Sequence, residues 1–460
     1  MHPWFRTLTE EVRDRPLPVE GTVPDWLDGA LVRNGPAHFE TAEGRVNHWF
    51  DGLAMLRRFG FDDGAVRYTN RFLRTEAYRS RTNGDVDATE FGTGPTSLRR
   101  RLESLLVPTA TDNANVTVAR LGGRTVALTE TPRMVVFDPE TLLTFGTRQF
   151  DDEVPGQWTA AHVEHDGERG ESVGLTVRFG RTSSYHVYRL PDGARERIEL
   201  ARLQVGEPAY VHSVGLTDRY VVLPEVPFTA DPRRFLRPGI DSFVDAFAWH
   251  PERPTRVHLV DRDDGSVSSV DASPFFFFHT VNAFDDGESV VLDLVSFPDA
   301  SVVEGLSFDR VERGVREATG ALRRVRIPVD GGRVSDRTLA SNVALPRTSP
   351  TVRRRPYRYA YAQRTGEGEF TGLARVDVER AAERVWSERG CFAGEPVFVP
   401  RETARRERDG EADGVVCSVV LDRDAERSFL LLLDGETFEE VGRAWLPHAL
   451  PLGFHGEYFG

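Results

Sequence analysis

The stretch that decides the fold class is RVHLVDRDDGSVSSV, residues 256–270. Two valine-rich runs with alternating polar residues flank an Asp-Gly pair, and this pattern is the typical signal of a β-hairpin. The pattern returns near the C-terminus, where residues 414–421 and 428–433 are apolar and a charged turn separates them. We therefore predict a chain built from short antiparallel strands.

Helical patterns are rare beside these strand signals. Residues 97–106 and 308–318 are the two helix candidates, and the second carries Val311, Val315 and Ala318 at helical spacing. Many strands with few helices predict an all-β protein. A β-propeller of six to eight four-stranded blades fits the 460 residues, because seven blades would take about 65 residues each. No linker-like segment divides the chain, so we expect one domain over residues 1–460.

The composition excludes several classes of function. The chain has 58 basic residues, all arginine, against 72 acidic residues, which gives a formal net charge of −14. Such a chain repels nucleic acid unless it carries a local basic patch, and the absence of lysine excludes Schiff-base and P-loop chemistry. No apolar run approaches the roughly 18 residues of a membrane span. Cys391 and Cys417 are too few for a disulfide framework, so we expect a cytoplasmic protein.

Four of the 12 histidines, His162, His212, His279 and His455, lie in apolar or small-residue surroundings at predicted strand ends. They are separated by 50, 67 and 176 residues, which is close to one, one and three blades. A propeller brings the innermost strand of every blade to one axis, so these side chains could meet at a metal ion. A single histidine on an apolar strand is more often a hydrogen-bonded core residue. Spacing alone therefore leaves both interpretations open.

Seven short blocks are spread over the chain: residues 21–36 (GTVPDWLDGALVRNGP), 48–52 (HWFDG), 111–114 (TDNA), 127–131 (ALTET), 278–284 (FHTVNAF), 394–399 (GEPVFV) and 453–456 (GFHG). Together and in this order they resemble the carotenoid cleavage oxygenase family. The resemblance implies a seven-bladed β-propeller with short helical caps over one face. It also implies a non-haem Fe(II) ion on the propeller axis, held by four histidines.

The resemblance assigns the iron ligands as His162, His212, His279 and His455. At the first of them the match departs from the family's Thr-Ala-His-Pro, because an extra alanine precedes His162 and Val163 replaces the proline. His165 is therefore a competing ligand. His48 belongs to a matching block, but the family has no ligand there, so its expected role is structural.

The family orients its ligands with three glutamates that accept a hydrogen bond from the outer imidazole nitrogen. Two of them match Glu130 and Glu395. The third position holds Ala344, and no carboxylate between Asp336 and Glu367 replaces it. The loss of such a partner typically costs about 10–100-fold in metal affinity or activity.

The activity that the resemblance implies is oxidative cleavage of a carotenoid or apocarotenoid double bond by O2, with central cleavage to retinal as the first choice. Lignostilbene-cleaving relatives bind the substrate's phenol with a lysine, and this chain has none, which disfavours stilbenoid cleavage. A non-catalytic or iron-impaired propeller that binds carotenoid or a protein partner is the alternative, and Ala344 favours it. A zinc hydrolase is disfavoured, because no carboxylate adjoins the four histidines as a general base.

Two segments are candidates for contact with an apolar substrate and with the membrane that contains it. Alternate rings of the run 275–278, Phe275 and Phe277, are expected to line a substrate tunnel, although a strand buried on both faces explains them equally. Residues 97–107 form a basic amphipathic segment that either touches a membrane or packs on the propeller as a surface helix. Residues 231–238 are a weaker candidate. We expect a monomer with peripheral membrane contact. The apolar face of the first segment consists of Leu98, Leu102, Leu105 and Leu106.

Overall fold

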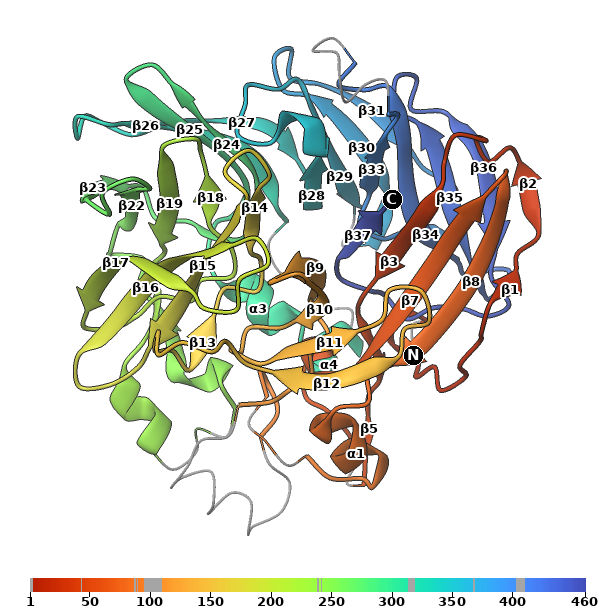
Figure 1. The fold of residues 1–460 in the computed structure, drawn as a ribbon, viewed down its shortest axis with the longest axis horizontal. Coiled ribbons are helices and arrows are strands. Elements are labelled where there is room, and N and C mark those ends of the chain that lie inside the picture. The colour runs from red at the N-terminus through yellow and green to blue at the C-terminus, as the bar shows by residue number, and fades with distance from the viewer. Residues whose placement is uncertain are drawn as a thin grey trace.

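The computed structural model describes residues 3–42, 44–86, 88, 90–94, 110–237, 240, 242–312, 319–366, 369–402 and 410–460. In these residues the strands form seven antiparallel sheets arranged as blades around a central axis, which is the predicted seven-bladed β-propeller (Figure 1). In four of the blades, the four strands lie side by side in the order in which they occur along the chain. These strands are β9 (Thr117–Leu121), β10 (Arg124–Leu128), β11 (Met134–Phe137) and β12 (Thr144–Arg148); β18 (Gly215–Leu216), β19 (Tyr220–Glu225), β22 (Thr255–Asp261) and β23 (Val267–Ala272); β24 (Phe276–Asp286), β25 (Ser289–Phe297), β26 (Ala321–Pro328) and β27 (Ser335–Ser341); and β28 (Val343–Thr348), β29 (Tyr359–Gly366), β30 (Glu369–Asp377) and β31 (Ala382–Trp386).

The three remaining blades are less regular. A fifth blade splits its first strand in two and contains β13 (Trp158–Thr159), β14 (Glu164–Asp166), β15 (Glu171–Arg178), β16 (Ser183–Pro191) and β17 (Ile198–Val205). The last two blades contain β32 (Cys391–Ala393), β33 (Val397–Pro400), β34 (Gly414–Asp422), β35 (Arg427–Asp434), β36 (Glu440–Trp445) and β2 (Val19–Gly21), and β1 (Arg15–Pro16), β8 (Ala65–Phe72), β7 (Leu53–Asp62), β4 (Pro36–His38), β3 (Gly29–Arg33) and β37 (Gly456–Phe459). Two small ribbons lie outside the blades: β5 (Glu40–Thr41) with β6 (Gly44–Arg45), and β20 (Phe228–Ala230) with β21 (Phe247–Trp249).

Both ends of the described chain close the ring. The N-terminal strand β2 pairs with β36, whereas the C-terminal strand β37 pairs with β3 near the start of the chain. Each of these two blades therefore combines strands from both ends of the chain, which ties the first and last blades together. The blade cores are apolar throughout: all residues from Phe429 to Leu433 of β35 are fully buried.

The hairpin predicted from residues 256–270 is confirmed as β22 and β23. Val257 faces Val270 and Leu259 faces Ser268 across the pair. The turn needs a glycine because Gly265 has a φ of +72°, and a Cβ atom there would lie 2.1 Å from the carbonyl oxygen of Leu200.

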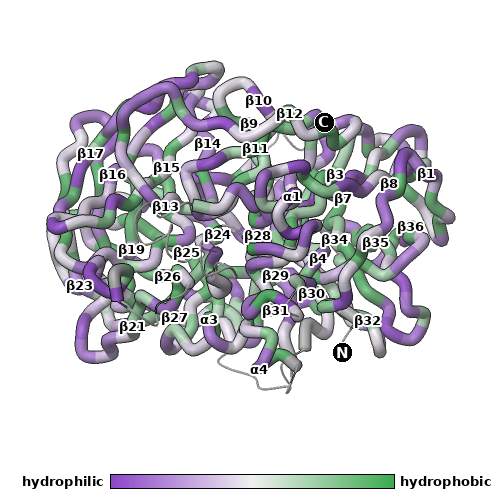
Figure 2. The backbone as a smooth tube through the Cα atoms, turned by 90° about the horizontal axis from the view of Figure 1, so that it is seen from below, coloured by the Kyte–Doolittle hydropathy of each residue, from purple (hydrophilic) through white to green (hydrophobic). Residues whose placement is uncertain are grey.

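Two short helices, α3 (Ser301–Gly305) and α4 (Phe308–Glu312), lie on one face of the propeller, as expected of helical caps (Figure 2). The other described helical segments are α1 (Glu76–Thr82) and the 3-10 turns η1 (Pro3–Phe5), η2 (Trp49–Asp51), η3 (Pro232–Leu236), η4 (Val244–Ala246) and η5 (Pro350–Val352). Figure 2 shows α3 and α4 on the lower face. The described part of the helix predicted over 308–318 is α4, whereas that predicted over 97–106 lies outside the described residues. No described helix is long and apolar enough to cross a membrane.

His48 connects this cap to the propeller, which agrees with the structural role expected of it. Its Nε2 donates to the carbonyl oxygen of Val303 in α3 at 2.9 Å, and its Nδ1 accepts from the backbone N–H of Phe50 at 3.1 Å. The ring is buried, and burial lowers the pKa of His48 to about 4 despite the hydrogen bond to Val303.

This burial predicts a loss of stability in acid. Unfolded His48 takes up a proton below about pH 6.5 whereas the folded residue stays neutral down to about 4, so its contribution to stability falls as the pH drops through that window. Between pH 7 and pH 5 it should remove about 2 kcal/mol from the free energy of unfolding. Urea unfolding of the metal-free protein at both pH values measures the loss. In H48N the free energy of unfolding should change less between the two pH values. An equal change in both proteins would exclude His48 as a cause of the acid-induced loss.

Candidate metal centre

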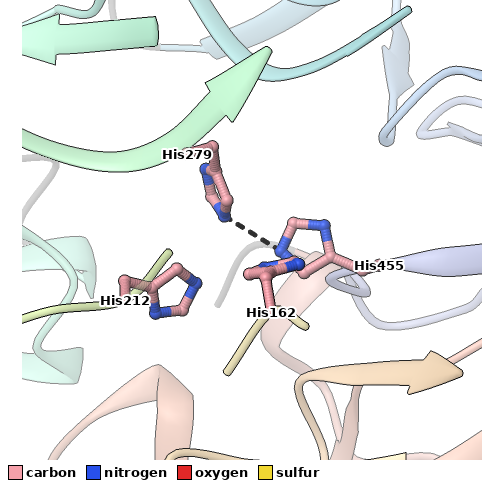
Figure 3. Close-up of side chains that lie close together, drawn as sticks. All are labelled: His162, His212, His279 and His455. Atoms are coloured by element: carbon pink, nitrogen blue, oxygen red, sulfur yellow. Dashed lines mark hydrogen bonds between the residues drawn. The ribbon is translucent and has the colours of Figure 1, made fainter. Parts of the chain in front are cut away.

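The structure brings the four predicted histidines together on the propeller axis, and we call them the histidine cluster. His162 lies between β13 and β14, His212 just before β18, His279 within β24, and His455 just before β37. Each therefore belongs to the innermost strand region of a different blade. One ring nitrogen from each histidine lies within 4.8 Å of the corresponding atoms of the others, and the rings converge on one point (Figure 3).

Hydrogen bonds between blades fix these positions. The backbone N–H of Ala161 donates to the carbonyl oxygen of His212 at 3.0 Å, which connects two neighbouring ligand positions. The hydroxyl of Ser213 donates to the carbonyl oxygen of Phe278 at 2.7 Å and accepts from the N–H of Thr280 at 3.3 Å. Ser213 thus holds the backbone on both sides of His279, where the pairing of β24 with β25 is irregular.

Two carboxylates orient two of the rings. Glu130 lies 2.7 Å from Nδ1 of His212, and Glu395 lies 2.7 Å from Nδ1 of His455. An ionised carboxylate only accepts hydrogen bonds, so both Nδ1 atoms carry the proton and both Nε2 atoms offer a lone pair. Both glutamates therefore occupy the positions expected from the sequence.

Glu395 is also the centre of a buried ion-pair network. It accepts from Nε of Arg347 at 2.8 Å and from the backbone N–H of Gly456 at 3.0 Å, and it forms a close pair with Arg33. Burial alone would raise the pKa of this carboxyl, but Arg347, His455 and Arg33 outweigh it and hold the pKa well below its usual range. Glu395 is therefore ionised over the whole neutral range.

The histidine cluster fits a divalent metal ion. Burial, followed by the neighbouring histidines, lowers the pKa values of His162 and His279 well below 6.5; burial also lowers the pKa of His455, to about 4. Neutral imidazole is the form that binds metals such as iron and zinc. The buried Nε2 of His162 has no hydrogen-bond partner among the described residues, and the Nε2 atoms of His279 and His455 are only 3.0 Å apart. A metal ion would give all of these atoms a partner.

His279 lacks the carboxylate that the other two rings have. No described carboxylate accepts from its Nδ1, and its recorded hydrogen bond uses Nε2. Ala344 lies half-buried in β28, the strand next to β24 across the blade boundary. The structure therefore agrees with the sequence in offering no carboxylate partner to His279 among the described residues.

His165, the competing ligand, lies outside the histidine cluster. Its side chain is 45% exposed, and its Nε2 lies 3.2 Å from Asp192. Among the described residues the groups that could hold a metal include His162 and not His165.

An aromatic wall adjoins the histidine cluster. The ring of Phe278 lies 5.5 Å from that of His212, and Phe50 lies 6.1 Å from Phe278 and 5.2 Å from Phe454. Tyr210 extends the wall and donates its hydroxyl hydrogen to Glu130. We use the term aromatic wall for Phe50, Phe91, Tyr210, Phe278 and Phe454.

The predicted tunnel residues are buried on the other face of their strand. Phe275 and Phe277 lie 6.2 Å from each other, and Arg323 stacks over Phe275. Phe276 and Phe278 pack together at 4.9 Å, and Phe278 is the one that meets His212. A tunnel lined by Phe275 and Phe277 stays a prediction. The proposed membrane-contact residues Leu98, Leu102, Leu105 and Leu106 lie outside the described residues, and that role stays a prediction too.

Three residues that support the site were not singled out from the sequence. Tyr210 precedes His212 by two positions and shares Glu130 with it, so its place close to a predicted ligand was an available signal. Arg33 falls within a matching block and Arg347 lies three residues after Ala344, but nothing in their neighbours indicates that they pair with Glu395.

Fold and site together define a seven-bladed β-propeller with a candidate metal centre of four histidines on its axis. The family model described as retinal pigment epithelial membrane protein matches residues 5–460. The mitochondrial carotenoid-cleaving dioxygenase of Mustela putorius furo is 30% identical and covers 99% of this chain and 96% of its own length. The chloroplastic carotenoid cleavage dioxygenase 8 homolog A of Oryza sativa subsp. japonica is 34% identical, covering 98% and 86%.

Solved structures of relatives share this fold. Cobalt-substituted Synechocystis ACO, an apocarotenoid oxygenase, superposes with a TM-score of 0.88 at 25% identity, covering 99% of this chain and 98% of its own. The chain belongs to the carotenoid cleavage oxygenase family.

Proposed function

We propose that this protein is a non-haem Fe(II) dioxygenase that cleaves a carbon–carbon double bond of a carotenoid or apocarotenoid. The observation that carries the proposal is the convergence of four histidines, two of them oriented by Glu130 and Glu395. Both oxygen atoms of O2 end in the two carbonyl products, so the reaction needs no further reductant. The names of the relatives, carotenoid-cleaving dioxygenase and apocarotenoid oxygenase, support this substrate class.

The choice of iron rests on the donor set. Four imidazoles without a carboxylate ligand suit a divalent transition metal, and Fe(II) is a redox-active metal of this class that would activate O2 when bound. Glu130 and Glu395 would keep His212 and His455 in the tautomer whose Nε2 binds the metal. Their negative charges, together with neutral ligands, would favour a dipositive ion.

The aromatic wall would bind the polyene. Its rings offer an apolar surface beside His212 and His279, and a conjugated hydrocarbon can pack there without leaving polar groups unsatisfied. The same rings would exclude water from the reacting bond, which protects the reaction from side products. Central cleavage to retinal is the finer proposal, and stilbenoid cleavage is disfavoured by the absence of lysine.

Product analysis tests the proposal. The protein is loaded anaerobically with Fe(II), exposed to O2 and a panel of carotenoids, apocarotenals and stilbenes, and the products are identified by mass spectrometry. We expect near one equivalent of iron and aldehyde products from the first two classes, with retinal from β-carotene. Failure to bind iron after anaerobic loading would contradict the enzyme assignment.

The second candidate is a propeller that binds a carotenoid or a protein partner without cleaving the carotenoid. The missing carboxylate beside His279 favours it, because such partners usually contribute about 10–100-fold to metal affinity or activity. Carotenoid binding with no product at full iron occupancy would support this candidate over the first.

A further inference from the structure

A polar cavity lies on the propeller axis and opens beside the histidine cluster, and we call it the axial cavity. His162, His279 and His455 line it on one side. The charged residues around it are three arginines and two carboxylates, Arg347, Arg353, Arg354, Glu164 and Glu395. The aromatic wall does not line this cavity, so it is distinct from the proposed polyene site.

Two of the three arginines are already paired. Arg347 donates to Glu395 at 2.8 Å, and Arg354 pairs with Asp166 at 2.9 Å. The guanidinium of Arg353, which is half-buried, forms no hydrogen bond or ion pair with any residue that the structure describes. Glu164 likewise forms no ion pair within the described part of the chain. Burial raises the pKa of Glu164 and the charge of Arg353 partly offsets this effect, so the two groups interact across the cavity without direct contact.

His279 lines this cavity, and its Nδ1 has no hydrogen-bond partner among the described residues. His279 uses Nε2 toward His455, so its Nδ1 points away from the centre, as Figure 3 shows. Nδ1 of His212 and Nδ1 of His455 each donate to a carboxylate at 2.7 Å. Strand β28 packs against β24, which carries His279, and holds Ala344 at the position where a carboxylate was expected. Pro346 and Arg347 of the same strand line the cavity.

We propose that the axial cavity binds a small carboxylate, the size of formate or acetate, between Arg353 and Nδ1 of His279. A guanidinium and a carboxylate match as a planar, bidentate pair, and a ring N–H adds a charge-assisted hydrogen bond. The bound anion accepts a hydrogen bond from Nδ1 of His279, as Glu130 and Glu395 do from Nδ1 of His212 and His455. The inference rests on the metal centre of the proposed function, but binding itself requires no turnover.

Binding is tested by calorimetric titration of the Fe(II)-loaded full chain with sodium formate under anaerobic conditions. We expect saturable binding that R353Q weakens about tenfold or more, because a charged hydrogen-bond partner is lost. R333Q is the matched control, since Arg333 is exposed on the β26–β27 loop and does not line the cavity. Unchanged formate binding in R353Q, or equal binding of chloride, would overturn the assignment.

Metal retention provides a second readout that an unfolded variant cannot mimic. Formate should slow the loss of Fe(II) to a chelator by about tenfold or more in the natural chain. A344E, which supplies a carboxylate from β28, should slow the loss without formate and should no longer respond to it. An A344E protein that still binds formate and responds to it would contradict the site.

These measurements separate the two proposals. Formate binding with no cleavage product would leave the anion site standing and count against the dioxygenase. Cleavage products with no saturable formate binding would leave the enzyme standing and refute the anion site.

Discussion

Replacement of His279 by alanine should reduce carotenoid turnover by more than about 100-fold while the propeller remains folded. Loss of an outer partner of a ligand already costs about 10–100-fold, and loss of the ligand itself should cost more. The side chain lies in the axial cavity region rather than in a blade core, so its removal leaves blade packing intact. Iron content and product yield measure the loss of turnover, and the melting temperature measures whether the propeller remains folded.

H165A is the control for this experiment. His165 lies three residues from His162 in the chain and borders the same cavity, but it is exposed and pairs with Asp192. It should retain iron and activity. Iron loss in H165A with normal iron in H162A would move the ligand assignment to His165, and full turnover in H279A would remove His279 from the ligand set.

The fold class was predictable because its signals are local. A hairpin such as β22–β23 is specified by a few alternating side chains and by a glycine that must adopt a positive φ. The number of blades was not predictable from pattern alone, since six to eight blades fit the length equally. It depends on how β2 pairs with β36 and β37 with β3, which are contacts between distant parts of the chain.

The candidate site was predictable only in part for a related reason. His279, His455, Glu130 and Glu395 lie in matching blocks. His162, His212 and the missing carboxylate at Ala344 were assigned by the resemblance at positions between those blocks. Which of the 58 arginines are buried is decided by tertiary contacts, so the pairing of Arg33 with Glu395 was not predictable. The axial cavity likewise forms from residues of six different blades, and no local pattern reports it.

The network around Glu395 makes this residue far more sensitive to substitution than Glu130, although each holds one ligand. E395Q removes the charge that Arg33 and Arg347 share, and the Arg33 side chain is only 4% exposed. A buried cation left without its partner typically costs about 3–5 kcal/mol of stability. In contrast, the side-chain partners of Glu130 are Tyr210 and His212, and no arginine pairs with it among the described residues.

We therefore expect E395Q to lower the free energy of unfolding by about 3–5 kcal/mol and to lose iron as well. E130Q should lose about 10–100-fold in iron affinity with a much smaller change in stability, because no cation is left unpaired. Urea unfolding of the metal-free variants separates stability from metal binding. If the two variants are equally stable without metal, Arg33 and Arg347 find other partners, and Glu395 acts on the metal centre only through His455.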